Sequence, residues 1–176
     1  GAAPVQWAIL NGEEKTGVTI FELNEKMDEG DILTSEEIEI LARENSWELE
    51  TRLAHIGAAL LIKTLEGREG IRPIPQDHSR ASYAPRLKKE QGRIDWTKDA
   101  LSIDRMVRAF APWPGAFTFF KGQRILVHGG RSVSPSGLGP VPGQVLEIYA
   151  KGIAVCCRDG SVFLVERLQR ENKKAM

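Results

Sequence analysis

An acidic turn near the beginning of the chain carries the side chains with the clearest potential for acid–base chemistry. The run Met27-Asp28-Glu29-Gly30-Asp31 places three carboxylates around one glycine. An aspartate ahead of a glycine-containing turn commonly caps backbone N–H groups, which is a structural role. The same Asp28 carboxylate could instead accept a proton or hold an imidazole in place. The local sequence alone favours the structural role, and Asp31 is interpreted as a structural or supporting acid.

The histidines and cysteines offer no competing catalytic set. His55 falls in an expected helix, His78 in a polar segment and His128 on an expected strand, so packing or solvent exposure is predicted for each. Cys156 and Cys157 are adjacent, and on a strand they would point to opposite faces. This arrangement favours core packing over a disulfide or a metal site. We therefore expect no metal ion.

A second chemically distinct set of residues is basic. Residues 1–70 hold six Lys and Arg against fifteen Asp and Glu, a net charge of −9, whereas residues 71–176 hold eighteen against nine, a net charge of +9. This separation favours a polyanionic partner for the second part, with nucleic acid the commonest. The alternatives are a solvated face, charge pairing between the two parts, or a linker kept soluble by its charge. The cations predicted to neutralise phosphates rather than to read bases are Arg86, Lys88, Lys89, Arg93, Arg105 and Arg108.

Two strands are expected to position the acidic turn. A helix is predicted to begin at Pro4, a favourable residue for the first helical position, and to end at Asn11-Gly12. Residues 16–23 and 32–40 are rich in β-branched and apolar side chains and are predicted as strands. The turn that carries Asp28 would then join these two strands.

A long helix is expected to follow the strands. Asn45 and Glu48 form the pattern of a capping box, and Gly67 ends the apolar periodicity. The expected buried stripe is Leu49, Leu53, Ile56, Leu60 and Leu61. A helix, two strands and a helix do not easily close a core. Without further strands, residues 1–70 are therefore predicted to expose apolar sheet surface.

The remaining residues are predicted to form a linker and a second domain. Residues 71–93 lose all periodicity, contain three prolines and are predicted to be a basic interdomain linker. A short helix follows, with Arg105 and Arg108 on its polar side. Strands are predicted at 116–120, 124–128, 143–149, 153–157 and 162–167, with Asp159-Gly160 as a hairpin turn and residues 131–142 as an exposed loop. Five short strands with tight turns predict a small antiparallel barrel over residues 94–176.

Several stretches, in this order, resemble the methionyl-tRNA formyltransferase family. The opening GAAPVQWAILNG is similar to the segment after that family's folate-binding loop, and TGVTIFELNEKMDEGDIL is similar to its strand-turn-strand around an active-site aspartate. The stretches LAHIGAALLIKTL, SYAPRLKKEQGRIDW, RAFAPWPGAFT and LQRENKKAM add to the likeness. Together they cover nearly the whole chain.

The resemblance implies an α/β plus all-β architecture in three parts. Residues 1–70 would be the later portion of a Rossmann-like formyltransferase domain, residues 71–93 the linker and residues 94–176 an OB-like barrel that binds tRNA. The implied reaction transfers a formyl group from 10-formyltetrahydrofolate to the amine of methionyl initiator tRNA. Asp28 would be the active-site aspartate, which orients and stabilises a protonated imidazole.

The sequence also departs from the family pattern. The family's Asn-x-His pair and most of its folate pocket have no counterpart after Gly1, so no folate-binding residue is predicted here. We interpret the sequence as a fragment of a longer gene product, inactive alone, rather than as a degraded remnant. Related formyltetrahydrofolate-dependent enzymes, namely hydrolases, dehydrogenases and amino-sugar formyltransferases, are the first alternative. A non-catalytic RNA-binding module is the second.

The expected setting of the complete protein is the cytoplasm. No run of eighteen apolar residues occurs, and the first residues lack the pattern of a signal peptide. The complete protein is therefore expected to have no membrane segment. Separately, it is expected to act as a monomer.

Overall fold

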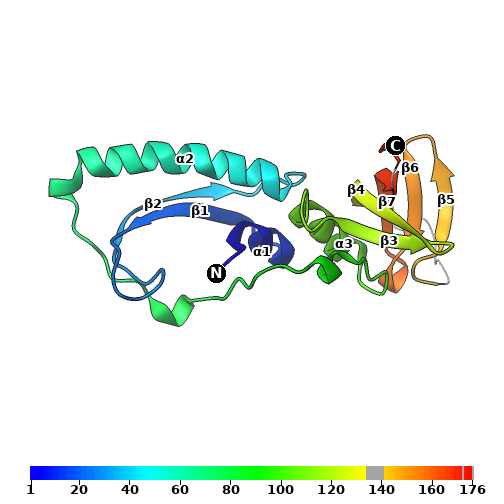
Figure 1. Cartoon of the computed structure of the whole chain (residues 1–176), viewed down its shortest axis with the longest axis horizontal. Helices are drawn as coiled ribbons and strands as arrows, with labels where there is room; N and C mark the ends of the chain where they lie inside the picture. Colours follow the sequence, from blue (N-terminus) through cyan, green and yellow to red (C-terminus); the bar gives the residue numbers. More distant parts are fainter. Residues whose placement is uncertain (134–140, 172, 176) are drawn as a thin grey trace.

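A computed structural model describes residues 1–133, 141–171 and 173–175, and its two ends differ in architecture (Figure 1). The first region is a two-stranded antiparallel sheet with helices beside it. The second is a five-stranded antiparallel sheet. A long irregular segment runs along the first region and leads into the helix between them.

The hairpin that carries the acidic turn forms where the sequence predicts it. Helix α1 spans Pro4–Asn11, and Gly12 after it adopts a left-handed φ of 74° that ends the helix. Strands β1 (Lys15–Phe21) and β2 (Ile32–Glu39) pair in antiparallel fashion. The predicted helix and both predicted strands are confirmed to within two residues at each end.

Helix α2 (Ser46–Glu66) covers one face of this hairpin. The predicted capping box is present, because the Asn45 side chain accepts from the Glu48 amide while the Glu48 carboxylate accepts from the Asn45 amide. The Thr64 and Thr34 hydroxyls meet at 2.9 Å across the contact between helix and strand. Of the predicted stripe, Leu49, Leu53 and Leu60 are buried. The prediction for Leu61 is wrong, since its side chain is 44% exposed.

The other face of the hairpin is polar. Its cross-strand pairs are Lys15 with Glu39, Gly17 with Glu37 and Thr19 with Ser35, all exposed. The expectation that residues 1–70 expose apolar sheet surface is therefore wrong for this hairpin. The exposed large apolar side chains of residues 1–70 lie instead on α2 and in the loops around the hairpin. Those on α2 are Trp47, Leu61, Ile62 and Leu65, and those in the loops are Leu23, Met27 and Leu41.

The segment predicted as a linker is docked along the first region rather than free. It contains only short 3₁₀ turns, η2 (His78–Arg80) and η3 (Lys89–Gly92), with η1 (Arg68–Gly70) just before it. Its backbone pairs with the start of β2 through an Ile32–Ile74 bridge. The Trp7 indole donates to the carbonyl of Pro85 at 2.8 Å. These contacts fix the path of the segment beneath the hairpin.

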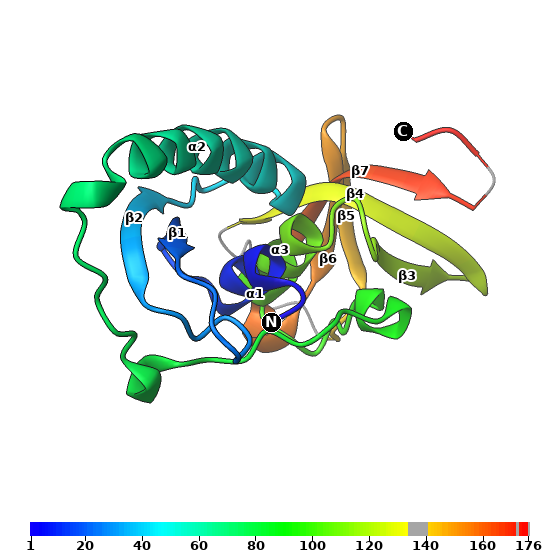
Figure 2. The same cartoon turned by 60° about the vertical axis from the view of Figure 1, so that its left-hand side comes forward.

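Helix α3 (Ala100–Ala109) joins the two regions, and Figure 2 shows it beside α1. The Asp99 side chain caps its first turn by accepting from the Ser102 amide at 2.8 Å. The apolar side of α3 packs against the second region, where Ile103 and Val107 are buried. At its end, Phe110 is buried against α1 and α2.

The second region is one antiparallel sheet in the order β3-β4-β7-β6-β5. Its strands are β3 (Ala116–Phe120), β4 (Gln123–Val133), β5 (Val145–Tyr149), β6 (Gly152–Cys156) and β7 (Val162–Arg170). All five predicted strands are confirmed, with β4 and β7 longer than expected. The predicted loop at 131–142 falls mostly on residues 134–140, which lie outside the described residues.

Among the described residues the five strands form an open sheet, so the barrel that the sequence predicts is not confirmed. Within the described residues, its edge strands β3 and β5 are not hydrogen bonded to each other. An apolar pocket of about 390 Å³ separates them, lined by Phe119 and Phe120 from β3 and by Val145 and Ile148 from β5. Apolar side chains thus line the gap where a closing ladder would run.

The cysteines pack in this core as predicted. Cys156 and Cys157 are each 1% exposed and form no disulfide. Burial raises the pKa of the Cys157 thiol to about 11, so it stays protonated and unreactive. No helix among the described residues is long and apolar enough to cross a membrane.

Candidate functional site

Asp28 lies in the loop between β1 and β2, at the end of the hairpin away from α3 (Figure 1). Its side chain is 66% exposed. Its backbone has a φ of 58°, a left-handed conformation that aspartate tolerates better than most residues. Asp31 closes the base of the loop through its carbonyl, which accepts from the Glu22 amide at 2.9 Å. The loop therefore holds the Asp28 carboxylate outward, where it is largely exposed and lies 3.9 Å from the Gly1 ammonium.

The backbone of this loop is tightly fixed, although the Asp28 carboxylate is exposed. Gly30 is buried, and a Cβ at this position would lie 1.6 Å from the carbonyl oxygen of Glu22, so only glycine fits. From the opposite side, the Gln76 amide nitrogen donates to the carbonyl oxygens of Asp28 at 3.0 Å and of Gly30 at 2.7 Å. The turn is thus held by Glu22, directly after β1, on one side and by Gln76 of the linker on the other.

No histidine of the described residues contacts Asp28. His55 lies 2.8 Å from the carbonyl oxygen of Thr51, and His128 lies 2.7 Å from the side-chain oxygen of Gln169. His78 is exposed in η2. Among the described residues, no group of three or more His, Cys, Asp or Glu side chains is arranged to hold a metal ion.

Four of the predicted phosphate-binding cations are exposed along the linker. Arg86, Lys88 and Lys89 are exposed, and the Arg93 guanidinium lies 5.7 Å from the centre of the Phe119 ring. None of the four forms an ion pair with a described residue. Their charges are therefore uncompensated locally and available to an anion.

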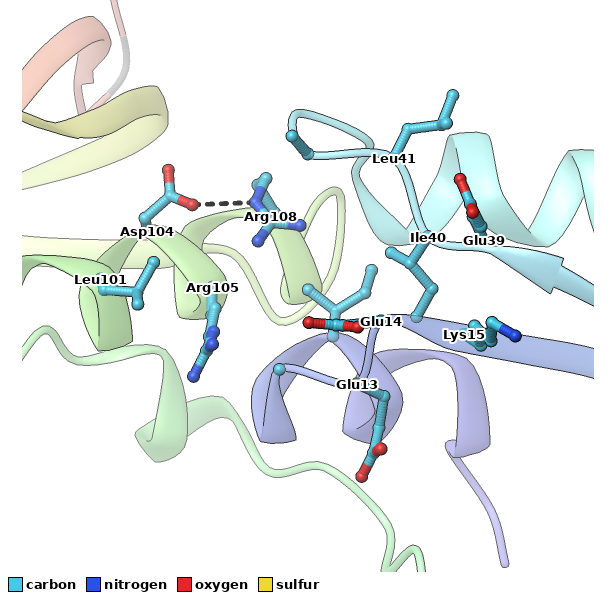
Figure 3. Close-up of a pocket in the computed structure, with 13 residues that line it drawn as sticks. Glu13, Glu14, Lys15, Glu39, Ile40, Leu41, Leu101, Asp104, Arg105 and Arg108 are labelled. Atoms are coloured by element: carbon cyan, nitrogen blue, oxygen red, sulfur yellow. Dashed lines mark hydrogen bonds and ion pairs between the residues drawn. The ribbon is translucent and has the colours of Figure 1, made fainter.

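Arg105 lines a pocket between the two regions (Figure 3). The pocket has a volume of about 460 Å³ and lies between the α1–β1 connection, the end of β2 and α3. The Arg105 guanidinium packs on Gly12, where a Cβ would lie 2.1 Å from its central carbon. Glu13 and Glu14 belong to the same pocket. Arg105 is thus positioned at the junction, in a pocket whose lining also includes these two acidic residues.

Arg108 differs from the other five cations because protein groups already satisfy it. Its guanidinium pairs with Asp104 at 3.0 Å, as Figure 3 shows, and donates to the carbonyl oxygen of Glu44 at 3.1 Å. Its side chain is only 16% exposed. Arg108 therefore connects α3 to the loop before α2, which is a structural role.

Two residues near these sites were not identified from the sequence. Gln76 lies in the aperiodic linker, where its own residue type gives no signal of a function. The available signal was indirect: Pro73 and Pro75 favour an extended backbone around Ile74 that could pair with a strand. Glu44 lies in the loop between β2 and α2 and is 7% exposed. Burial alone would raise the pKa of its carboxyl, but hydrogen bonds from Arg52 and the Leu41 amide outweigh burial and lower that pKa.

Two family models match the chain. Residues 1–65 match the model described as formyl transferase, and residues 86–176 match the model described as formyl transferase, C-terminal domain.

Curated relatives align with the chain from end to end. A methionyl-tRNA formyltransferase from Solibacter usitatus is 45% identical over 99% of this chain and 55% of its own length. One from Alkaliphilus oremlandii is 41% identical over 100% of this chain and 57% of its own length. The chain thus spans little more than half the length of the curated relatives that it matches.

A solved structure shares the fold. A sugar 3N-formyl transferase, WlaRD, crystallised in the presence of dTDP and 5-N-formyl-THF, superposes with a TM-score of 0.73. The match covers 99% of this chain and 61% of that one at 19% sequence identity. At this identity the likeness bears on the fold alone.

Proposed function

The chain belongs to the formyl transferase family, and we propose that the complete protein containing it is a methionyl-tRNA formyltransferase. The observation that carries the proposal is the 41–45% identity, over essentially the whole chain, to enzymes of that name. The formyl donor would be 10-formyltetrahydrofolate, and the acceptor would be the amine of methionyl initiator tRNA.

The proposed reaction needs no covalent enzyme intermediate. The methionyl amine nitrogen attacks the formyl carbon and the bond from that carbon to the folate nitrogen breaks. The amine nitrogen loses a proton, and the released folate nitrogen takes one up. An asparagine and a histidine of the family, outside this sequence, would stabilise the developing oxyanion. Asp28 would orient and stabilise the protonated imidazole and assist removal of the amine proton.

The described residues fit only part of such a site. Asp28 has the required exposed carboxylate on a fixed backbone, but it lines neither of the pockets described above. A folate cavity is not formed around it by the described residues, so we derive no step for the folate from this chain. The remaining part of the site is proposed to lie in the rest of the complete protein.

The basic residues are proposed to hold the tRNA. Arg86, Lys88, Lys89 and Arg93 are exposed and unpaired within the described residues, which supports contact with phosphates. Arg105 and Arg108 are retained as tRNA contacts on the strength of the sequence alone, and Arg108 is the weakest of the six because Asp104 and Glu44 already bind it.

The proposal extends to the organisation of the complete protein. Residues 1–70 would complete a Rossmann-like catalytic domain, residues 71–93 would link it to the tRNA-binding domain, and residues 94–176 would form that domain. An OB-like closure of its sheet remains part of the proposal. We also propose that the complete enzyme acts in the cytoplasm as a monomer.

The alternative is a formyltransferase that acts on an amino sugar. The fold shared with a sugar 3N-formyl transferase is compatible with this candidate but does not distinguish it from the first. The exposed linker cations favour the larger polyanion, since a sugar nucleotide needs far fewer of them. The two candidates predict different acceptors, so a direct assay separates them.

The test uses the complete gene product that contains this segment. Its transfer of formyl from 10-formyltetrahydrofolate is measured with methionyl-tRNA and with dTDP-linked amino sugars as acceptors. We expect activity only with methionyl-tRNA, and we expect Asp28→Asn to lower kcat/KM by at least about 100-fold. Asp159→Asn is the matched control, because Asp159 also has a left-handed φ of 56° in a hairpin turn of the second region. Transfer to the sugar alone would overturn the proposal.

A further inference from the structure

Gln76 connects the linker to the turn that carries Asp28. A single side-chain amide donates to two carbonyl oxygens of that turn, those of Asp28 and Gly30, at 3.0 and 2.7 Å. An amide NH₂ group has two hydrogens, so one Gln76 nitrogen can satisfy both acceptors. No other described side chain donates to these two carbonyls.

The linker backbone sets the position of this amide. Pro73 and Pro75 favour extended backbone at the residues before them. Ile74, between the two prolines, makes a complete bridge with Ile32 at the start of β2, with N–H···O distances of 2.8 and 2.9 Å. Gln76 follows two residues later and therefore faces the loop that ends at Ile32.

The turn needs such support. Asp28 holds a left-handed φ of 58°, which costs a non-glycine residue about 1 kcal/mol. Gly30 packs against Glu22 so closely that no side chain fits, which fixes one side of the turn. Gln76 holds the other side. Without its two hydrogen bonds, the peptide groups from Asp28 to Gly30 could rotate and redirect the Asp28 carboxylate.

We infer that Gln76 is a positioning residue for formyl transfer, which acts by fixing the direction of the Asp28 carboxylate. The inference rests on the proposed function of Asp28. It also gives the linker a second role: the segment that carries Arg86, Lys88, Lys89 and Arg93 for tRNA also holds the catalytic turn in place. Gln76 itself touches no reacting atom.

The first test is a double-mutant cycle in the complete protein. Gln76→Glu keeps the shape of the side chain but cannot donate when ionised, so it faces both carbonyls with a repelling oxygen. We expect kcat to fall at least about tenfold, as for other small misplacements of a catalytic group, with KM for methionyl-tRNA changed less than about twofold. In the Asp28→Asn background, the same substitution should have almost no further effect on kcat.

Controls separate the inference from the proposed function. Gln144→Glu introduces the same charge at an exposed position ahead of β5 and should leave kcat unchanged. Gln76→Asn lacks one methylene and should remain impaired, since its shorter amide cannot reach both carbonyls. If Asp28→Asn loses activity while Gln76→Glu keeps it, or if the two losses multiply, the positioning role is wrong and the proposed function stands.

A second measurement does not depend on the acceptor. Hydrogen exchange at the amides of residues 28–31 should be at least about tenfold faster in Gln76→Glu than in the parent, because local opening of the turn becomes easier. Unchanged exchange there would overturn the inference even in a fully active enzyme. Faster exchange in a protein that does not formylate methionyl-tRNA would show that Gln76 holds the turn in place, and it would reject the proposed function.

Discussion

The two regions of the molecule differ in how they obtain a hydrophobic core. Every buried residue of the core in the second region lies between Ile94 and Val165. The core of the first region combines its own Ile9, Leu49 and Leu53 with residues from much later in the chain. Those later residues are Leu87, Ala109 and Phe110. The second region is therefore self-contained, whereas the first depends on the linker and on α3.

Helix α3 belongs to both cores and accounts for this asymmetry. Ile103 and Val107 pack into the second region, one turn apart on the same face. Ala109 and Phe110, at the end of the helix, pack against the first region. The helix is thus fixed by the sheet and in turn supports α1 and α2. Substitutions in the two cores should consequently spread to different extents.

The largest effect is expected for Phe163→Ala. Phe163 on β7 is fully buried and lies against Trp96, with ring centres 6.4 Å apart. Its truncation should cost about 4 kcal/mol of stability through lost burial and the cavity left behind. Because Ile103 and Val107 of α3 pack into this core, the loss should spread through α3 to the first region. Hydrogen exchange in the complete protein would show lower protection in β6 and β7 and also in α1 and α2.

Phe110→Ala provides the contrast to this substitution. Phe110 is 3% exposed and lies in the shared core. Its truncation should lower protection in α1 and α2 as well as at the end of α3, and should leave β6 and β7 unchanged. A loss confined to the second region for Phe163→Ala, or a loss in β6 and β7 for Phe110→Ala, would contradict the proposed difference between the two cores.

The sequence predicted the elements of both regions because their signals are local. Pro4, Asn45 and Gly67 mark helix ends, and Asp159-Gly160 marks a hairpin turn. Such signals involve residues only a few positions apart. The acidic turn was singled out for the same reason, since Asp28 and Gly30 are close in sequence.

What the sequence did not predict depends on contacts between distant residues. Closure of the sheet was expected from the number of strands, and it is not confirmed, since an apolar pocket lies between β3 and β5 among the described residues. Leu61 fits the helical periodicity yet is exposed, because the hairpin covers only one side of α2. Gln76 lies 48 residues from Asp28, so no spacing rule could join the two.

An intermediate effect is expected for Glu44→Gln at the junction of the two regions. The Glu44 carboxylate accepts from Arg52 at 2.9 and 2.7 Å and from the Leu41 amide at 3.1 Å. Removing one charge of this nearly buried pair should cost about 2 kcal/mol, less than in a fully buried pair because Arg52 is partly exposed. Thermal unfolding of the complete protein at pH 7 would measure the loss.

The pH dependence of this loss provides a further check. The pKa of Glu44 is lowered in the folded state, because the hydrogen bonds from Arg52 and the Leu41 amide outweigh the effect of burial. Its stabilisation is therefore complete above the ordinary value near 4.5 and is lost as the pH falls through the lowered folded value. The difference between parent and variant should shrink below that point. A difference that stays constant down to acid pH would exclude the carboxylate charge as its cause.

The smallest effect is expected at the exposed edge of the junction, where Arg43 pairs with Glu166 of β7 at 2.7 Å. Arg43 is 67% exposed, and Glu166 keeps a second partner in Arg131 at 2.9 Å. Arg43→Ala should therefore cost less than about 0.5 kcal/mol, and the cost should vanish in high salt. Arg131→Ala, which removes the partner within the second region, is the matched control. If Arg43→Ala separated the protection of the two regions as strongly as Phe110→Ala does, ion pairing rather than the shared apolar core would hold them together.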